Sequence, residues 1–249
     1  MAIRWKSQPP LPDVLPEYEQ WVRSETGQTV TRIEQELVNR ALVQCFGYHL
    51  LQLSVNRYCD LAAESRIQRV YRAHPQASPD DHQLHCEFTD LPFATDSLDC
   101  VLLHHVQEYV ANPHVLLREV QRVVVPRGHL ILVGFNPWSV TGVRAAASRF
   151  LPGMTWHNHL LSCSRMVDWM ELLGFTVDEV CFGYRRPALR KFQRLPLGNI
   201  YVISAVKEVA AISPPRRRWQ SVKAGFALAP AKTPVAGRHP GRITNRNSM

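Results

Sequence analysis

The chain has 249 residues, of which 45% are hydrophobic and 20% are charged, and it carries a net charge of +8. This is the composition of a globular protein with one large domain or two small ones, and it excludes a collagen or a disulfide-stapled miniprotein. No stretch approaches the roughly 18 uncharged apolar residues of a membrane-spanning helix, and the N-terminus lacks the apolar core of a secretory signal. Six cysteines without a C-x-x-C pair predict reduced thiols in a cytoplasmic protein.

The N-terminal part begins with four prolines among the first 16 residues, which predict an extended lead-in over 1–16. Thr31-Arg32-Ile33-Glu34 has the capping-box pattern, and the apolar stripe behind it predicts a helix that stops near Gly47. Three further elements are expected, namely a buried strand at 48–53, a helix at 61–67 and a weak strand at 68–71.

The central and C-terminal parts alternate strands and helices. Asn112-Pro113 has the N-cap and first-turn pattern of a helix, which Pro126-Arg127-Gly128 is expected to end. Ser162 or Ser164 caps a later helix, and Gly174 occupies its C′ position. Strands are expected at 98–103, 129–134, 175–182 and 200–206. This alternation predicts an α/β protein with a doubly wound, mostly parallel sheet.

Residues 87–134 carry a recognisable pattern: the tripeptide Leu91-Pro92-Phe93, the step Leu98-Asp99 into an apolar strand, and the turn Pro126-Arg127-Gly128. This segment closely resembles the second half of the class I S-adenosylmethionine-dependent methyltransferase domain, in the type 11-like subgroup that acts on small molecules. The resemblance implies a Rossmann-like methyltransferase fold with an antiparallel C-terminal strand. It also implies S-adenosylmethionine as the cofactor and methyl transfer as the activity.

The resemblance implies places for the cofactor as well. Glu87 stands where an acid reaches the adenine amino group, and Phe88 stands where an apolar residue flanks the ring. His104, at the end of the fourth strand, stands where the segment lines the methionine end.

The glycine-rich loop of the family is altered in this chain. Ser54, Asn56 and Tyr58 occupy the three glycine positions, and Gln52 replaces the acid before them. Side chains at these positions crowd the backbone's approach to a cofactor and disfavour positive φ. Gln52, Ser54 and Asn56 are nevertheless the residues that the resemblance places beside the cofactor. The second strand also lacks the acid that binds the ribose, because it ends in Val70-Tyr71-Arg72-Ala73.

His104 and His105 are the candidate catalytic residues, as a general base or a polar wall, with hydrogen-bonded structural histidines as the alternative. Because neighbouring residues of a strand alternate, we expect the two rings to point to opposite sides. His157-x-His159 with Cys163 is the only metal-like cluster in the sequence, and we expect no metal site.

The positive charge is concentrated at the C-terminus. Residues 209–249 contain eight basic residues, five prolines and no acid, whereas the other 208 residues hold 21 basic and 21 acidic residues. This composition predicts a basic disordered tail over 209–249, behind a methyltransferase-like domain over 17–208. Clustered arginine makes nucleic acid a candidate partner of the tail.

Three hypotheses of function follow. The first is an S-adenosylmethionine-dependent methyltransferase that acts on an unidentified small molecule. The second is a non-catalytic relative that has lost the cofactor and works as a binding or scaffold protein. The third is an RNA-directed methyltransferase that uses the basic tail. The sequence indicates neither the acceptor nor the oligomeric state.

Overall fold

The fold is that of a computed structural model, which describes residues 11–75, 84–139, 160–185, 193 and 195–208. All of these residues lie in one compact unit of the chain. None of the helices in these ranges is long and apolar enough to cross a membrane. The predicted tail over 209–249 and the pair His157 and His159 fall outside the described residues.

The centre of the domain is a seven-stranded sheet with the order β3-β2-β1-β4-β5-β7-β6. The strands β1 to β5 pair in parallel, and β7 runs antiparallel to both of its neighbours. The predicted doubly wound sheet with an antiparallel C-terminal strand is therefore confirmed. The strands are β1 (His49–Ser54), β2 (Arg69–His74), β3 (Leu84–His85), β4 (Leu98–His104), β5 (Val124–Phe135), β6 (Phe175–Gly183) and β7 (Ile200–Lys207).

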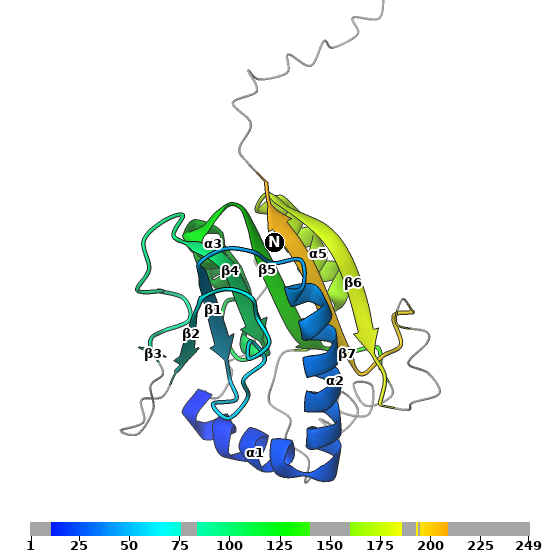
Figure 1. Ribbon diagram of the computed structural model, residues 1–249. Helices are drawn as coiled ribbons and strands as arrows, with labels where there is room; N and C mark the ends of the chain where they lie inside the picture. Colours follow the sequence, from blue (N-terminus) through cyan, green and yellow to red (C-terminus); the bar gives the residue numbers. More distant parts are fainter. Residues whose placement is uncertain (1–10, 76–83, 140–159, 186–192, 194, 209–249) are drawn as a thin grey trace, which may run out of the picture. The chain divides into compact units, whose positions relative to one another are not determined.

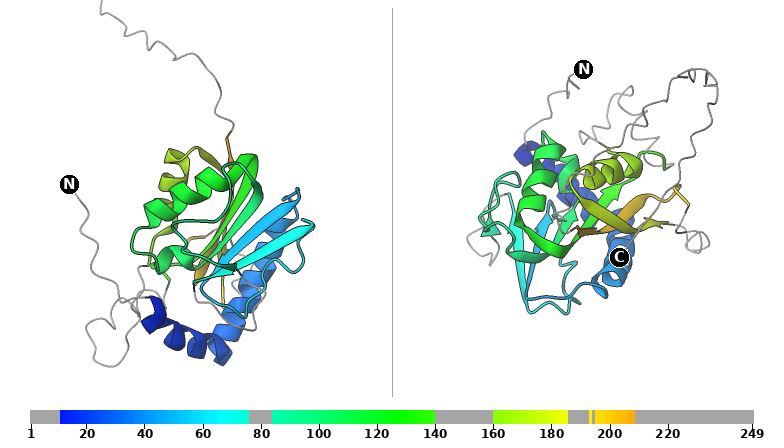
Figure 2. Two further views of the ribbon diagram at one scale, coloured as in Figure 1. Left: turned by 90° about the vertical axis from the view of Figure 1, so that its left-hand side faces the viewer. Right: turned by 90° about the horizontal axis from the view of Figure 1, so that it is seen from above.

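Helices cover both faces of the sheet and one of its ends (Figures 1 and 2). α2 packs on one face, where its apolar stripe meets inward-facing residues of β1, β4, β5 and β7. On the other face, α3 and α5 pack over a second apolar cluster. α1 lies across the end of the sheet at which β1 points, so it covers the carboxyl edge of the strands (Figure 1). The helices are α1 (Leu11–Arg23), α2 (Glu25–Leu42), the 3-10 turn η1 (Val106–Glu108), α3 (Pro113–Val123) and α5 (Cys163–Leu172).

The N-terminal helices begin earlier than the sequence indicates. The predicted extended lead-in over 1–16 is wrong from Leu11 onward, because α1 begins there. Pro12 falls in the first turn, where a missing N–H costs nothing, and Pro16 removes one donor only. Burial of Val14, Leu15 and Tyr18 against the sheet offsets that loss.

α2 begins at Glu25, with Ser24 as the N-cap that accepts a hydrogen bond from the Gly27 N–H at 3.1 Å. The helix start predicted at Thr31 is therefore wrong, since Thr31 lies inside α2. Glu34, read from the sequence as a capping residue, is instead a buried residue of the helix interior. A serine followed by an acid is as good an N-cap signal as the later pattern, and packing of the whole stripe selects the longer helix.

The crossover from β1 to β2 contains turns where the sequence predicts a helix over 61–67. Leu61 and Ala62 are buried in the cluster under α2, so the N-terminal helix covers this face in place of a crossover helix. Pro126-Arg127-Gly128 lies within β5, with Arg127 at a φ of 67°, and the helix α3 already ends at Val123. The strands predicted at 175–182 and 200–206 are confirmed, as are the N-caps at Asn112 and Ser162.

The last strand is fastened to the domain by a buried lysine. The Lys207 ammonium donates to the carbonyl oxygens of Gln121 and Val124 at 2.7 and 2.6 Å, and to the Asp96 carboxylate at 2.7 Å. These three acceptors lie in the α3–β5 corner and the loop before β4. One side chain thus joins the end of β7 to the end of α3.

We expect Lys207→Met to lower the free energy of unfolding by about 1–3 kcal/mol, because it leaves the carbonyl groups of Gln121 and Val124 without their donor. Denaturant unfolding followed by circular dichroism measures the change. The matched control is Arg118→Met on the exposed face of α3, for which we expect a change within about 0.5 kcal/mol. Equal effects of the two substitutions would contradict a fastening role for Lys207.

Candidate functional site

The carboxyl ends of β1 and β4 meet at the centre of the sheet, where Ser54 pairs with His104. The sheet changes its winding direction between these two strands, and α/β proteins bind ligands at such switch points. The loops that follow, residues 55–60 and 105–110, form the floor of the candidate site. α1 lies above it.

The loop after β1 is fixed by the polar side chains that replace the family's acid and glycines. The Gln52 side chain donates to the Cys59 carbonyl at 2.6 Å and accepts from the Ala62 N–H at 3.1 Å. Asn56 donates its N–H to the Ser54 hydroxyl oxygen at 3.0 Å and accepts from the Tyr58 N–H at 3.0 Å. Side chains of this kind stabilise tight turns by bonding to the backbone two residues away.

This loop follows a path that needs no glycine. Among the described residues other than glycine, positive φ occurs only at Asp96, His105 and Arg127, and none of these lies in residues 54–58. Ser54 and Asn56 are buried, so their side chains fill the space that glycines leave open. His74, at the end of β2, bonds through Nε2 to the Val55 carbonyl at 3.0 Å and closes the loop from the other side.

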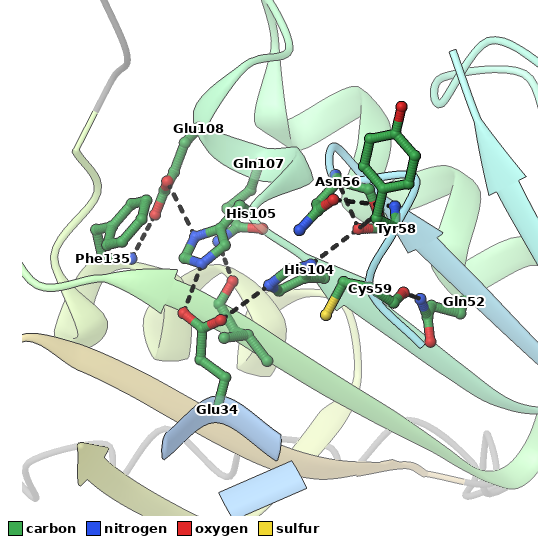
Figure 3. A network of polar contacts seen from close by, with 12 residues as sticks. Glu34, Gln52, Asn56, Tyr58, Cys59, His104, His105, Gln107, Glu108 and Phe135 are labelled. Carbon is green, nitrogen blue, oxygen red and sulfur yellow. Dashed lines mark hydrogen bonds and ion pairs between the residues drawn. The ribbon is translucent and has the colours of Figure 1, made fainter. Parts of the chain in front are cut away.

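Glu34, His104, His105 and Glu108 form a fully buried group, which we call the histidine–carboxylate cluster (Figure 3). Glu34 reaches in from α2 and accepts hydrogen bonds from Nε2 of His104 at 3.1 Å and Nε2 of His105 at 2.9 Å. Each Glu34 carboxylate oxygen accepts a hydrogen bond from one of the two imidazole rings. The cluster therefore joins α2 to the carboxyl end of β4.

Each imidazole is also held at its second nitrogen. Nδ1 of His104 lies 2.8 Å from the Ser54 hydroxyl, and Nδ1 of His105 lies 3.2 Å from the Glu108 carboxylate. Glu108 in turn accepts the Phe135 N–H, so the cluster continues to the end of β5. The orientation of both rings is thereby fixed from two sides.

The prediction that the two histidines point to opposite sides is wrong. His105 has a φ of 59° and a ψ of 6°, in the left-handed region, so the strand alternation ends at His104. Both rings consequently face Glu34, with their centroids 4.6 Å apart. A non-glycine residue in this conformation costs about 1–3 kcal/mol and requires support from its surroundings, which the two carboxylates and the stacked Phe135 ring provide.

Burial and charge act against each other in the cluster. Burial by itself raises the pKa of Glu34, but the neighbouring His105 and His104 lower it to about 2. Burial lowers the pKa of His105, and the charges of Glu108 and Glu34 outweigh it and raise the pKa to about 10. Burial lowers the pKa of His104 and raises that of Glu108. The cluster thus holds His105 as a cation between carboxylates, with His104 neutral.

α1 covers the cluster with aromatic rings. The Tyr18 ring lies 6.2 Å from that of His105 and 5.7 Å from that of Tyr109, and Trp21 packs edge-on against Phe135 at 5.5 Å. Burial, followed by the charge of Glu34, raises the pKa of Tyr18. α1 therefore covers the part of the carboxyl edge in which the cluster lies.

The structure brings together most of the residues predicted from the sequence. Gln52, Ser54 and Asn56 lie in one buried network, and His104 and His105 adjoin it. Glu87 is exposed on the loop after β3, whereas the neighbouring Phe88 is buried in the apolar cluster that includes side chains of α1.

Sequence reasoning missed Glu34. The available signal was an acid at a buried helical position, since Val30, Leu37, Val38 and Ala41 around it are all buried. An ionisable residue within an apolar helical stripe must find a buried partner.

Comparisons with known proteins agree with this architecture. Residues 45–132 match the family model described as a methyltransferase domain. An uncharacterized protein of Escherichia coli (strain K12), YafS, is 31% identical over 160 residues, which are 63% of this chain. The match spans about 65% of the length of that relative.

Several solved structures share the fold. A SAM-dependent methyltransferase of Thermotoga maritima superposes with a TM-score of 0.56 at 18% identity, covering 79% of this chain and 97% of that one. Geranyl diphosphate C-methyltransferase of Streptomyces coelicolor A3(2) gives 0.54 at 18% identity, covering 78% and 84%. The [4+2]-cyclase SpnF gives 0.57 at 12% identity, covering 82% and 98%.

The strand order, the switch point between β1 and β4 and the matched domain agree with one another. The chain has the Rossmann-like methyltransferase fold, and its residues 45–132 are similar to the methyltransferase domain. The likeness to a protein named as a cyclase shows that this fold also occurs in proteins named for other chemistry, so the activity must be argued from the site.

We expect Glu34→Ala to lower the free energy of unfolding by about 3–5 kcal/mol, because it leaves the His105 cation and the His104 N–H without their buried acceptor. The control is Glu171→Ala at an exposed position of α5, with an expected change within about 0.5 kcal/mol. Urea unfolding of the two variants and the parent chain measures both values. A change below about 1 kcal/mol for Glu34→Ala would mean that the two imidazoles find other partners.

Proposed function

We propose that the chain is an S-adenosylmethionine-dependent methyltransferase that acts on a small-molecule acceptor. The observation that carries the proposal is the match of residues 45–132 to the methyltransferase domain, which spans the switch point between β1 and β4. A small acceptor is favoured because α1 packs across the carboxyl edge of the sheet with Tyr18 and Trp21, and a small molecule needs a smaller displacement of that helix than a macromolecule does. Methyl transfer needs alignment and desolvation more than a dedicated acid or base.

The residues at this edge do not fit the cofactor in the family's usual way. The side chains of Ser54 and Asn56 fill the glycine positions, and His74 bonds to the loop backbone near the place of the ribose-binding acid. Cofactor binding therefore requires α1 and the loop over 54–58 to move. Free energy spent on this rearrangement weakens the apparent affinity.

His104 and His105 remain predicted catalytic residues, and their contacts argue for a positioning role. Both ring nitrogens of each histidine are already engaged by neighbouring side chains. A general base needs a free nitrogen within hydrogen-bond reach of the proton it removes. Glu87 and Phe88 are the side chains we expect at the adenine end.

A second candidate function is favoured by the same filled loop. A non-catalytic relative that keeps the fold for binding or scaffolding has no need for the glycine path, and the network of Gln52, Ser54 and Asn56 stabilises the closed loop. The RNA-directed hypothesis depends on basic residues that largely lie outside the described ranges, so it stays a prediction.

We expect calorimetric titration with S-adenosylmethionine to give a dissociation constant well above the micromolar range. Asn56→Gly removes a side chain from a glycine position and should tighten binding about tenfold, a change of about 1.4 kcal/mol. Glu87→Ala should weaken binding by about 1–3 kcal/mol through loss of the adenine contact. Asn112→Asp, at the N-cap of α3, is the control that should leave affinity unchanged.

The outcomes separate the two candidates. A submicromolar dissociation constant for the parent chain would show that the filled loop does not hinder the cofactor. Absence of heat with both S-adenosylmethionine and S-adenosylhomocysteine, for the parent chain and for Asn56→Gly, would remove the enzyme and leave the binding protein.

A further inference from the structure

The histidine–carboxylate cluster has the donor set of a metal site, although the sequence led us to expect none. One oxygen of Glu34 and one ring nitrogen from each of His104 and His105 lie within 4.8 Å of one another, and all three residues are buried. Two imidazoles and a carboxylate on one side of an ion are a recurrent ligand set for zinc and for divalent iron. We propose that Glu34, His104 and His105 bind a divalent transition-metal ion.

The spacing of the donor atoms suits an ion between them. Ligand atoms about 2.0–2.1 Å from a tetrahedral zinc ion stand about 3.3 Å apart. Nε2 of His104 and of His105 lie 3.1 and 2.9 Å from the two Glu34 oxygens. One donor atom from each of the three residues lies within 4.8 Å of the others, and Figure 3 shows both rings directed at the Glu34 carboxylate.

The groups at the second ring nitrogen of each histidine are of the kind that a metal-binding histidine requires. A ring that binds metal through Nε2 carries its proton on Nδ1, where a carboxylate, a carbonyl or another acceptor fixes its tautomer and direction. Glu108 stands at Nδ1 of His105 (Figure 3). The Ser54 hydroxyl stands at Nδ1 of His104. Glu108 is itself anchored by the Phe135 N–H.

This arrangement gives a reason for one of the missing glycines. Ser54 stands at the first glycine position of the family loop, and its hydroxyl is the group that holds His104. A glycine there has no side chain with which to hold the ring.

The charges of the cluster also favour a bound cation. The cluster contains two buried carboxylates, from Glu34 and Glu108, and two imidazoles. A divalent cation held by two neutral imidazoles neutralises both carboxylates. Its binding releases the Nε2 proton of the His105 cation to solvent, and the single proton of His104 moves from Nε2 to Nδ1. A buried ion network of this size adds little stability over apolar packing, so stability by itself does not account for it.

The number of protein ligands indicates which type of metal site this would be. Three protein ligands leave a coordination position open, as in catalytic zinc sites, whereas structural zinc sites close all four. Binding of the ion by these three ligands does not depend on whether S-adenosylmethionine binds.

The test is metal analysis of the full chain, expressed without a polyhistidine tag. We expect about one transition-metal ion per chain on purification. After chelator treatment, added Zn²⁺ should restore that content and raise the melting temperature. Glu108→Gln keeps the shape of the side chain but removes the carboxylate behind His105, and it should weaken Zn²⁺ affinity about 10–100-fold. His114→Asn, which alters a histidine that packs on Trp169, is the control that should bind as the parent does.

Zinc-edge absorption spectroscopy of the parent chain identifies the ligands even if a variant fails to fold, and two imidazole ligands are expected. A folded, chelator-treated parent chain that takes up no stoichiometric Zn²⁺, with a melting temperature unmoved by it, would overturn the proposal and leave an ion network only. Zn²⁺ uptake by Glu108→Gln and His104→Asn equal to that of the parent would place the ion elsewhere and overturn it too. Titrations without S-adenosylmethionine keep this result separate from the test of methyltransferase function.

Discussion

The buried carboxylate of Glu34 is the contact on which the arrangement of this domain depends. It brings charge from the N-terminal helix α2 into the centre of the carboxyl edge, where the two imidazoles at the end of β4 neutralise it. A carboxylate without those partners would be expelled from a site of such low polarity. The position of α2 over the sheet, the left-handed turn at His105 and the closed loop after β1 are all linked through this group.

One face of the sheet is covered by the N-terminal helix α2 and not by a crossover helix between β1 and β2. In the described part of the chain, the connection from β1 to β2 is a series of turns, and α2 occupies that face of the sheet. Leu61, Ala62 and Ile67 pack beneath α2 and fill the layer that a crossover helix otherwise supplies. A helix that begins directly after a glycine-rich loop directs its N-terminal N–H groups at a ligand. This chain has neither the glycines nor that helix, and polar side chains take their place.

The carboxyl edge of the sheet therefore keeps the strand order of the fold, but the side chains that line it are different. The strand order still brings Ser54 next to His104, as the switch point of a doubly wound sheet requires. The side chains there now bond to one another and to the loop backbone. α1 closes the edge with Tyr18 and Trp21, so any ligand of the family's kind must displace packed aromatic rings. Such an enclosure raises the strength of every electrostatic contact inside it, since water is excluded.

The sequence by itself determined the sheet and the resemblance of its central part to a methyltransferase domain. Short continuous apolar runs located the buried strands, because burial on both faces of a parallel sheet imposes them. The segment 87–134 carried the methyltransferase pattern. Local signals also gave the N-caps at Asn112 and Ser162. Only the tertiary structure decided the site. Glu34 and His105 are about 70 residues apart in the chain, and no local pattern indicates that an acid within an apolar helical stripe will meet two histidines at a strand end. The direction of the His105 ring depended on a left-handed φ that only its buried partners stabilise, and the extent of α1 depended on Val14, Leu15 and Tyr18 finding the edge of the sheet.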